Sequence, residues 1–315
     1  MILVARTVEK AEVVRMEVDS LLLEHHQNQQ EEAATAVEIL ACDQSSLTSV
    51  REFVTELRRL LANTGATGLD ALCLNAAMMA PSDAPPQFTE DGIELTFQTN
   101  HLAPFLIANL IHDLINPGGR VIFTTSGLHA FVSFNGFRGI REVRKRFETI
   151  DGNDFHFKAA YSVSKLANTT CCLTLNRKIY QLRGRRDVVV NCFTPGLIPS
   201  TGLFRHSERP SMSKMGSTVE HGGGALAWMA MSDEAGQQGG LFYKTQSGTS
   251  HDPPSYGSKS FCSAPIPDDA ADISNQELLW RISAELVGID GVLKPRQDGS
   301  LKLRQDLNKA MQVIG

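Results

Sequence analysis

Short apolar runs alternate along the chain with longer segments in which apolar residues recur every three or four positions. Runs of the first kind are typical of strands buried on both faces, and the longer segments are typical of helices that bury one side. Strands are predicted at residues 1–5, 36–41, 69–74, 120–125, 187–193 and 240–244. Helices are predicted at residues 8–32, 47–62, 89–115, 220–231 and 276–287, with a further helix from near Tyr161 to residue 182. This alternation predicts an α/β fold, a doubly wound parallel sheet with helices on both faces.

Two segments depart from the alternation. Residues 127–159 read as a long insertion with mixed charges, and residues 245–270 are rich in Ser, Pro, Gly and Asp, which predicts a flexible surface loop. The chain shows no internal repeat. We expect residues 1–290 to form a single domain and residues 291–315 to form a polar, peripheral tail.

The composition narrows the function classes. An apolar content of 42% and a charged content of 21% are enough for a sizeable core. A net charge of −5 gives no basic field for nucleic acid, so we expect no nucleic-acid partner. No apolar run approaches the roughly 20 residues that span a bilayer, and no targeting segment is visible at residues 1–5, which already have a strand pattern. The six cysteines include no Cys-x-x-Cys pair, so we expect reduced, mostly buried thiols of an intracellular protein and no metal site.

Tyr161 and Lys165 are the first candidates for chemistry. They are four residues apart, so on a helix they share one face. An ammonium group beside a phenol favours the phenolate, and we therefore expect a lowered phenol pKa and an acid/base group. A single pair with this spacing arises by chance in many chains, so the interpretation needs partners.

Further polar or turn residues follow the predicted strands at their carboxyl ends. In doubly wound sheets, ligands bind outside those ends. The residues that follow the first five predicted strands, in order, are Arg6, Asp43, Asn75, Ser126 and Pro195-Gly196. Loops are generally polar, so it is the order and identity of this set that carry information.

The set resembles the short-chain dehydrogenase/reductase superfamily. Leu74-Asn75-Ala76-Ala77 is similar to the superfamily's Asn-Ala-Gly turn beside the cofactor, and Thr99-Asn100-His101-Leu102 is similar to the helix that carries its asparagine. Ser126 stands at the place of its substrate-orienting serine. Tyr161 and Lys165 match its Tyr-x-x-x-Lys motif.

The match continues beyond the helix that carries Tyr161. Pro195-Gly196 is similar to the superfamily's Pro-Gly turn, and Ser200 stands where a threonine usually contacts the nicotinamide. The resemblance implies a Rossmann-like fold and a cofactor site that includes Asn75, Ala76, Lys165, Pro195, Gly196 and Ser200.

The resemblance also implies a mechanism. Ser126 would hydrogen-bond a substrate oxygen, and Tyr161 would donate a proton while the nicotinamide delivers hydride. Lys165 would lower the phenol pKa and hold the ribose hydroxyls. Asn100 would position a water that relays protons to Lys165.

Arg6 indicates which dinucleotide is used. An arginine after the second strand of such a fold can pair with a ribose 2′-phosphate, whereas NAD enzymes favour an acidic residue there. Lys10 could add charge, and Asp43 would accept from the adenine amino group. We therefore expect NADPH.

Two branches of the superfamily are similar to this chain. Residues 88–102, 195–205, 239–243 and 279–288 resemble light-dependent protochlorophyllide oxidoreductase, which implies a tetrapyrrole substrate, chlorophyll biosynthesis and a plastid location. Residues 164–168 resemble retinol dehydrogenases, and Leu197 stands where the first branch has a cysteine; both favour a light-independent carbonyl or retinoid reductase. A non-catalytic binding protein is a third reading, and a homo-oligomer stays open.

One feature of the superfamily has no counterpart in this sequence. The superfamily begins with a strand and a Thr-Gly-x-x-x-Gly-x-Gly loop that approaches the cofactor diphosphate at a helix N-terminus. This sequence starts where the second strand is expected, so we expect the first strand and the glycine-rich loop to be lacking. In the order 3-2-1-4-5-6, the first strand pairs with the second and the fourth. The lack predicts an N-terminally incomplete domain with unpaired central strands and poor NADPH binding.

Overall fold

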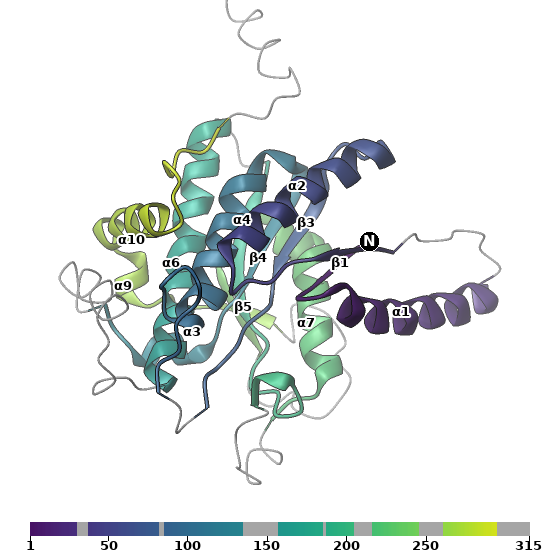
Figure 1. Ribbon diagram of the computed structural model, residues 1–315, viewed down its shortest axis with the longest axis horizontal. Helices are drawn as coiled ribbons and strands as arrows, with labels where there is room; N and C mark the ends of the chain where they lie inside the picture. The colour runs from purple at the N-terminus through teal and green to yellow at the C-terminus, as the bar shows by residue number, and fades with distance from the viewer. Residues whose placement is uncertain are drawn as a thin grey trace, which may run out of the picture.

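The computed structural model describes residues 1–29, 37–81, 85–134, 157–184, 187–204, 216–245 and 261–294. Within them, helices and strands form an α/β fold with a central parallel sheet, as the sequence predicts (Figure 1). Most of the insertion at 127–159, much of the loop at 245–270 and residues 295–315 of the predicted tail lie outside the described residues.

The larger sheet has five strands in the order β3-β4-β5-β6-β7. β3 (Leu69–Leu74), β4 (Ile115–Thr124), β5 (Val189–Thr194) and β6 (Phe242–Thr245) run parallel. β7 (Phe261–Ala264) pairs antiparallel with β6, although it falls inside the segment predicted to be a loop. Its apolar residues are too few to stand out among the surrounding Ser, Pro and Gly.

A second, two-stranded sheet lies beside the larger one. β1 (Ile2–Ala5) pairs parallel with β2 (Glu38–Ala41), and among the described residues neither strand is hydrogen-bonded to β3. In the order 3-2-1-4-5-6, β1 corresponds to the second strand and β3 to the fourth. The two sheets are therefore separated at the place where the first strand is expected. The backbone edge of β3 on that side therefore has no strand partner within the described part of the chain.

Both faces of the larger sheet are covered by packed side chains, because alternate residues of β4 face two different core clusters. Val121 and Phe123 face one core cluster, whereas Ile122 faces the other. Among the helices of the larger cluster are α2 (Leu47–Thr64), α4 (Ala103–Ile111) and α6 (Phe157–Arg183). The smaller cluster includes Ala225, Trp228 and Met229 of α7 (Val219–Met231).

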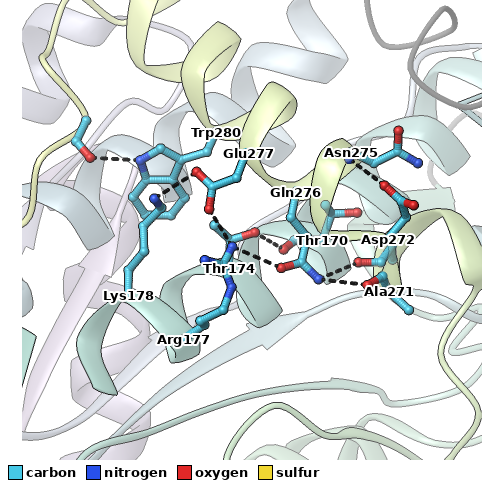
Figure 2. Close-up of polar contacts among 12 residues, drawn as sticks. Thr170, Thr174, Arg177, Lys178, Ala271, Asp272, Asn275, Gln276, Glu277 and Trp280 are labelled. Carbon is cyan, nitrogen blue, oxygen red and sulfur yellow. Dashed lines mark hydrogen bonds and ion pairs between the residues drawn. The ribbon is translucent and has the colours of Figure 1, made fainter. Parts of the chain in front are cut away.

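The C-terminal helices cover α6. α9 (Asp268–Ala271) and α10 (Ile273–Leu286) both contact it, and Figure 2 shows the polar side chains at this contact. Glu277 on α10 accepts hydrogen bonds from Arg177 at 2.6 Å and from Lys178 at 3.0 Å. The indole N–H of Trp280 donates to the carbonyl of Gly291 at 2.8 Å. The two bonds of Glu277 hold α10 against α6, the helix that carries Tyr161.

Two further helices are short or poorly packed. α1 (Val8–Gln29) follows β1 and has Ala11 fully buried, while Val13 and Met16 are exposed. α8 (Asp233–Gln237) follows α7 and is capped by Ser232.

The predicted helix at 89–115 begins later than expected. Phe88 forms a β-bridge with Glu94, and Gly92 has a φ of 75°, so the chain turns before it becomes helical. The Glu94 carboxylate accepts from the backbone N–H groups of Thr96 and Phe97 and starts α3 (Leu95–Phe97). A π-helical stretch, η1 (Gln98–Leu102), leads into α4. A 3-10 turn, η2 (His112–Leu114), then leads into β4.

Candidate active site

Thr124 and Thr125, at the end of β4, hold Lys165 on α6. The Lys165 ammonium donates to the carbonyl of Thr124 at 2.9 Å. The Thr125 hydroxyl donates to the carbonyl of Lys165, also at 2.9 Å. Ser126 caps η3 (Gly127–Phe131), a 3-10 turn, and its hydroxyl accepts from the backbone N–H of Leu128. The end of β4 therefore holds both the ammonium group and the backbone carbonyl of Lys165. Ser126 follows directly after Thr125 in the chain.

Tyr161 and Lys165 come together with Ser126, as the sequence predicts. Tyr161 is 6% exposed and Lys165 is 1% exposed. The Lys165 ammonium lies 5.7 Å from the centroid of the Tyr161 ring, and the Ser126 side chain is close enough to the Tyr161 phenol to lower its pKa. A buried phenol, a buried amine and a half-buried hydroxyl thus lie together at the carboxyl end of the sheet.

The expected lowering of the Tyr161 pKa is wrong for this structure. Burial raises the pKa of the Tyr161 phenol to about 12, and the hydrogen bond to Ser126 opposes the rise. Burial lowers the pKa of the Lys165 ammonium to about 7. Both shifts have the same cause, since low-dielectric surroundings disfavour whichever form is charged. The helical spacing alone says nothing about how deeply the pair is buried, so it missed this effect.

Asn100 lies in the π-helical stretch and clamps a neighbouring loop. Its side-chain oxygen accepts from the backbone N–H of Met78, and its amide donates to the carbonyl of the same residue, both at 2.8 Å. The amide also lies 3.1 Å from the Ser164 hydroxyl, on α6. π-bulges are frequent at functional sites. Through Ser164, which directly precedes Lys165, Asn100 is connected to the helix that carries Tyr161.

Asn75, directly after β3, lies at the same carboxyl end of the sheet. Its side-chain oxygen accepts from the Thr124 hydroxyl at 2.8 Å, so it is linked to the residue that holds Lys165. Asn75 and Ala76 are exposed at the end of β3. Gly196 follows β5 in an exposed turn with a φ of 83°, which only glycine adopts easily, and Ser200 is exposed a few residues later.

The remaining cofactor candidates lie with the two-stranded sheet. Arg6 and Lys10 are exposed at the junction of β1 and α1. The Asp43 carboxylate accepts from the backbone N–H of Ser45 at 2.9 Å and from its hydroxyl at 2.7 Å. No hydrogen bond among the described residues joins these three side chains to the group around Lys165.

Several residues that support the site escaped the sequence analysis. The hydroxyls of Thr125 and Thr169 contact the Lys165 carbonyl, and the Ser164 hydroxyl contacts the Asn100 amide. His129 in turn contacts the Thr169 hydroxyl. On α6, Thr169 lies four residues after Lys165, and that helical spacing was the one available signal.

The residues at the carboxyl end of the larger sheet fit the nicotinamide half of a nicotinamide dinucleotide. Asn75, Ala76 and Gly196 are exposed after β3 and β5, and the buried Lys165 ammonium lies at the end of β4 between those strands, an arrangement that fits a ribose and a nicotinamide ring. Within the described residues, neither β1 nor β3 is followed by a glycine-rich turn, so they supply no cradle for the diphosphate.

Two searches of the described residues bear on other site types. No group of three or more His, Cys, Asp or Glu side chains in them could hold a metal ion. No helix among them is long and apolar enough to cross a membrane.

Known proteins are similar to this chain. The family model for short chain dehydrogenases matches residues 3–137. The Protochlorophyllide reductase, chloroplastic, of Chlamydomonas reinhardtii is 30% identical over 282 residues, which are 81% of this chain and 66% of that protein. The Short-chain dehydrogenase TIC 32 A, chloroplastic, of Brassica napus is 35% identical over 179 residues, 54% of this chain and 50% of that protein. The chain thus spans 66% or less of the length of these relatives.

A solved structure shows the same fold. The short chain dehydrogenase from Burkholderia cenocepacia in complex with NADP superposes with a TM-score of 0.53 at 19% identity. The match covers 77% of this chain and 84% of that one. At this identity, the likeness supports the fold alone.

Proposed function

Because the chain belongs to the short-chain dehydrogenase/reductase superfamily, we propose that it is an NADPH-dependent oxidoreductase whose catalytic residues are Ser126, Tyr161 and Lys165. One observation carries the proposal. The Ser126 side chain is close enough to the Tyr161 phenol to lower its pKa, and the Lys165 ammonium lies 5.7 Å from the centroid of the Tyr161 ring at the end of β4. Chance would bring a Tyr-x-x-x-Lys pair together on a helix but would not add the hydroxyl and the strand end.

Each residue has a distinct role in the proposed reaction. Tyr161 keeps its proton at neutral pH, because its pKa is about 12, and is therefore the proton donor to a substrate oxygen or carbon. Ser126 orients the acceptor atom against that phenol. Lys165, with a pKa of about 7, exchanges protons near neutral pH and holds one close to Tyr161. The nicotinamide supplies the hydride when it is bound.

Asn100 has a supporting role. Its amide is engaged by Met78 and Ser164, so it fixes the loop after β3 against α6. In the proposed reaction, Asn100 also positions a water that relays protons to Lys165.

The choice of NADPH rests on Arg6 and Lys10. Both are exposed next to β1, where a guanidinium can make a bidentate contact with a ribose 2′-phosphate. Asp43 already accepts two hydrogen bonds through one oxygen, and its other oxygen would accept from an adenine amino group.

The substrate in the leading proposal is a protochlorophyllide-like tetrapyrrole, reduced in the light as part of chlorophyll biosynthesis in a plastid. The Chlamydomonas relative over most of this chain and the word "chloroplastic" in both relatives' names support it. A light-independent reductase of carbonyls or retinoids is the second candidate. Leu197 favours it, since an aliphatic side chain beside the Pro-Gly turn cannot donate a proton to a pigment.

One assay separates the candidates. NADPH oxidation is followed with protochlorophyllide in light and in darkness, and then with retinal in darkness. Loss of the pigment band only in the light supports the first proposal, and dark turnover of retinal supports the second. Folded protein that binds NADPH but turns over neither substrate would refute both and support a binding protein derived from a reductase.

A further inference from the structure

His129 ties the loop that carries Ser126 to the rest of the molecule. It lies three residues after Ser126 and is 1% exposed. Its backbone N–H donates to the carbonyl of Ser126 at 3.0 Å. Its Nδ1 lies 2.8 Å from the Thr169 hydroxyl, and its ring packs 4.5 Å from the ring of Phe242, measured between centroids. One buried side chain therefore anchors the turn after Ser126 on both α6 and β6.

The partner of His129 belongs to the network around Lys165. The Thr169 hydroxyl lies 3.1 Å from the Lys165 carbonyl, which also accepts from the Thr125 hydroxyl. The two threonine hydroxyls are 3.0 Å apart. The contacts form a closed path from Ser126 through His129 and Thr169 to Lys165, and back through Thr125 to Ser126. Ser126 is thus held from its C-terminal side by His129 and from its N-terminal side by Thr125.

The chemistry of His129 excludes two other roles. Burial lowers its pKa to about 4, so the imidazole is neutral at pH 7 and offers one N–H and one acceptor. The hydroxyl of Thr169 suits either tautomer, since it can donate or accept. Among the described residues, no cluster of ligands accompanies His129 that could hold a metal. A neutral, buried ring bonded to a threonine can hold geometry without exchanging protons.

We propose that His129 is a positioning residue, which holds the Ser126 hydroxyl against the Tyr161 phenol by anchoring the turn after Ser126 to Thr169. The proposal rests on the proposed function for its kinetic consequence only. Its structural consequence is a change at Tyr161 that can be read without any substrate. Catalytic geometry that shifts by about 1 Å can cost on the order of 100-fold in rate.

The test reads Tyr161 directly. The chain is labelled with 13C at the Cζ carbon of tyrosine, and the Tyr161 signal is assigned by its absence in Tyr161→Phe. Ser126→Ala defines the change in that signal when the hydroxyl is lost. His129→Leu should move the signal in the same direction, and the double variant Ser126→Ala/His129→Leu should move it no further. His129→Asn, whose amide can replace Nδ1, should restore the wild-type signal.

Kinetics supply the second readout. With a substrate that the wild type turns over, His129→Leu should lower kcat on the order of 100-fold and leave the KM for NADPH unchanged. If His129→Leu does not fold, Thr169→Val removes the same bond from the other side and should give the same two results. A folded His129→Leu or Thr169→Val variant with a wild-type Tyr161 signal would overturn the proposal. Absence of turnover in the wild type would count against the proposed function, while the Tyr161 signal would still decide the role of His129.

Discussion

Replacing Lys165 with methionine should stabilise the folded chain while it removes the proposed activity. Lys165 is 1% exposed, and burial lowers its pKa from 10.5 to about 7. Each pKa unit corresponds to about 1.4 kcal/mol, so keeping this ammonium charged in the folded state costs about 5 kcal/mol at pH values below 7. Methionine fills a similar volume without a charge. It leaves the Thr124 carbonyl without its donor, which costs about 1–3 kcal/mol.

The sign of the pH dependence follows from the direction of the shift. Between pH 7 and 10.5 the unfolded chain binds a proton at Lys165 that the folded chain has lost, so wild-type stability rises with pH. The cost of burying Lys165 therefore shrinks by about 3–4 kcal/mol between pH 7 and pH 10. The advantage of Lys165→Met should shrink by the same amount.

The assay is urea unfolding of the wild type and Lys165→Met at pH 7 and at pH 10, followed by circular dichroism. Lys10→Met is the matched control, because Lys10 is exposed and its ammonium meets water in both states. The control should show no comparable change between the two pH values. If the difference between Lys165→Met and wild type were the same at pH 7 and pH 10, the reasoning about burial would be refuted.

Two further predictions concern other parts of the molecule. His101 is fully buried between Asn168 and Ser283, and burial lowers its pKa to about 4, so the chain should lose about 3 kcal/mol of stability at this residue as the pH falls from 6.5 to 4. His101→Gln should remove that part of the acid dependence in urea unfolding at pH 7 and pH 4.5; an unchanged difference between the two pH values would contradict it. Arg6→Asp should lower the ratio of kcat/KM for NADPH over NADH at least about tenfold, because it repels a 2′-phosphate, and an unaltered ratio would exclude Arg6 from the site.

The parallel sheet and the helix of Tyr161 could be predicted because both follow from local periodicity. The spacing of Tyr161 and Lys165 places them on one side of α6, and the rule that strand ends meet at one edge brings Ser126 and Asn75 to them. These features need only the order of elements, which the apolar pattern supplies.

Other features depend on contacts between distant residues. α3 begins at Leu95 and not at residue 89, because the chain pairs Phe88 with Glu94 before it turns helical. β7 is a strand because β6 offers it an edge. Such pairings leave little trace in local sequence.

The direction of the Tyr161 pKa also depended on tertiary structure. Helical spacing predicts how close the ammonium is, but the surrounding core decides whether either charged form is tolerated. His129 and Thr169 were missed for a related reason, since their role appears only when the turn after Ser126 packs on α6.

The central claim is that Tyr161 donates the proton in a nicotinamide-dependent reduction. Its most direct test compares the kcat of the wild type and of folded Tyr161→Phe for NADPH oxidation with the substrate that the wild type accepts. The phenol is the donor in this account, so Tyr161→Phe should lower kcat by about 10²–10⁴-fold. Wild-type turnover in Tyr161→Phe would contradict the account.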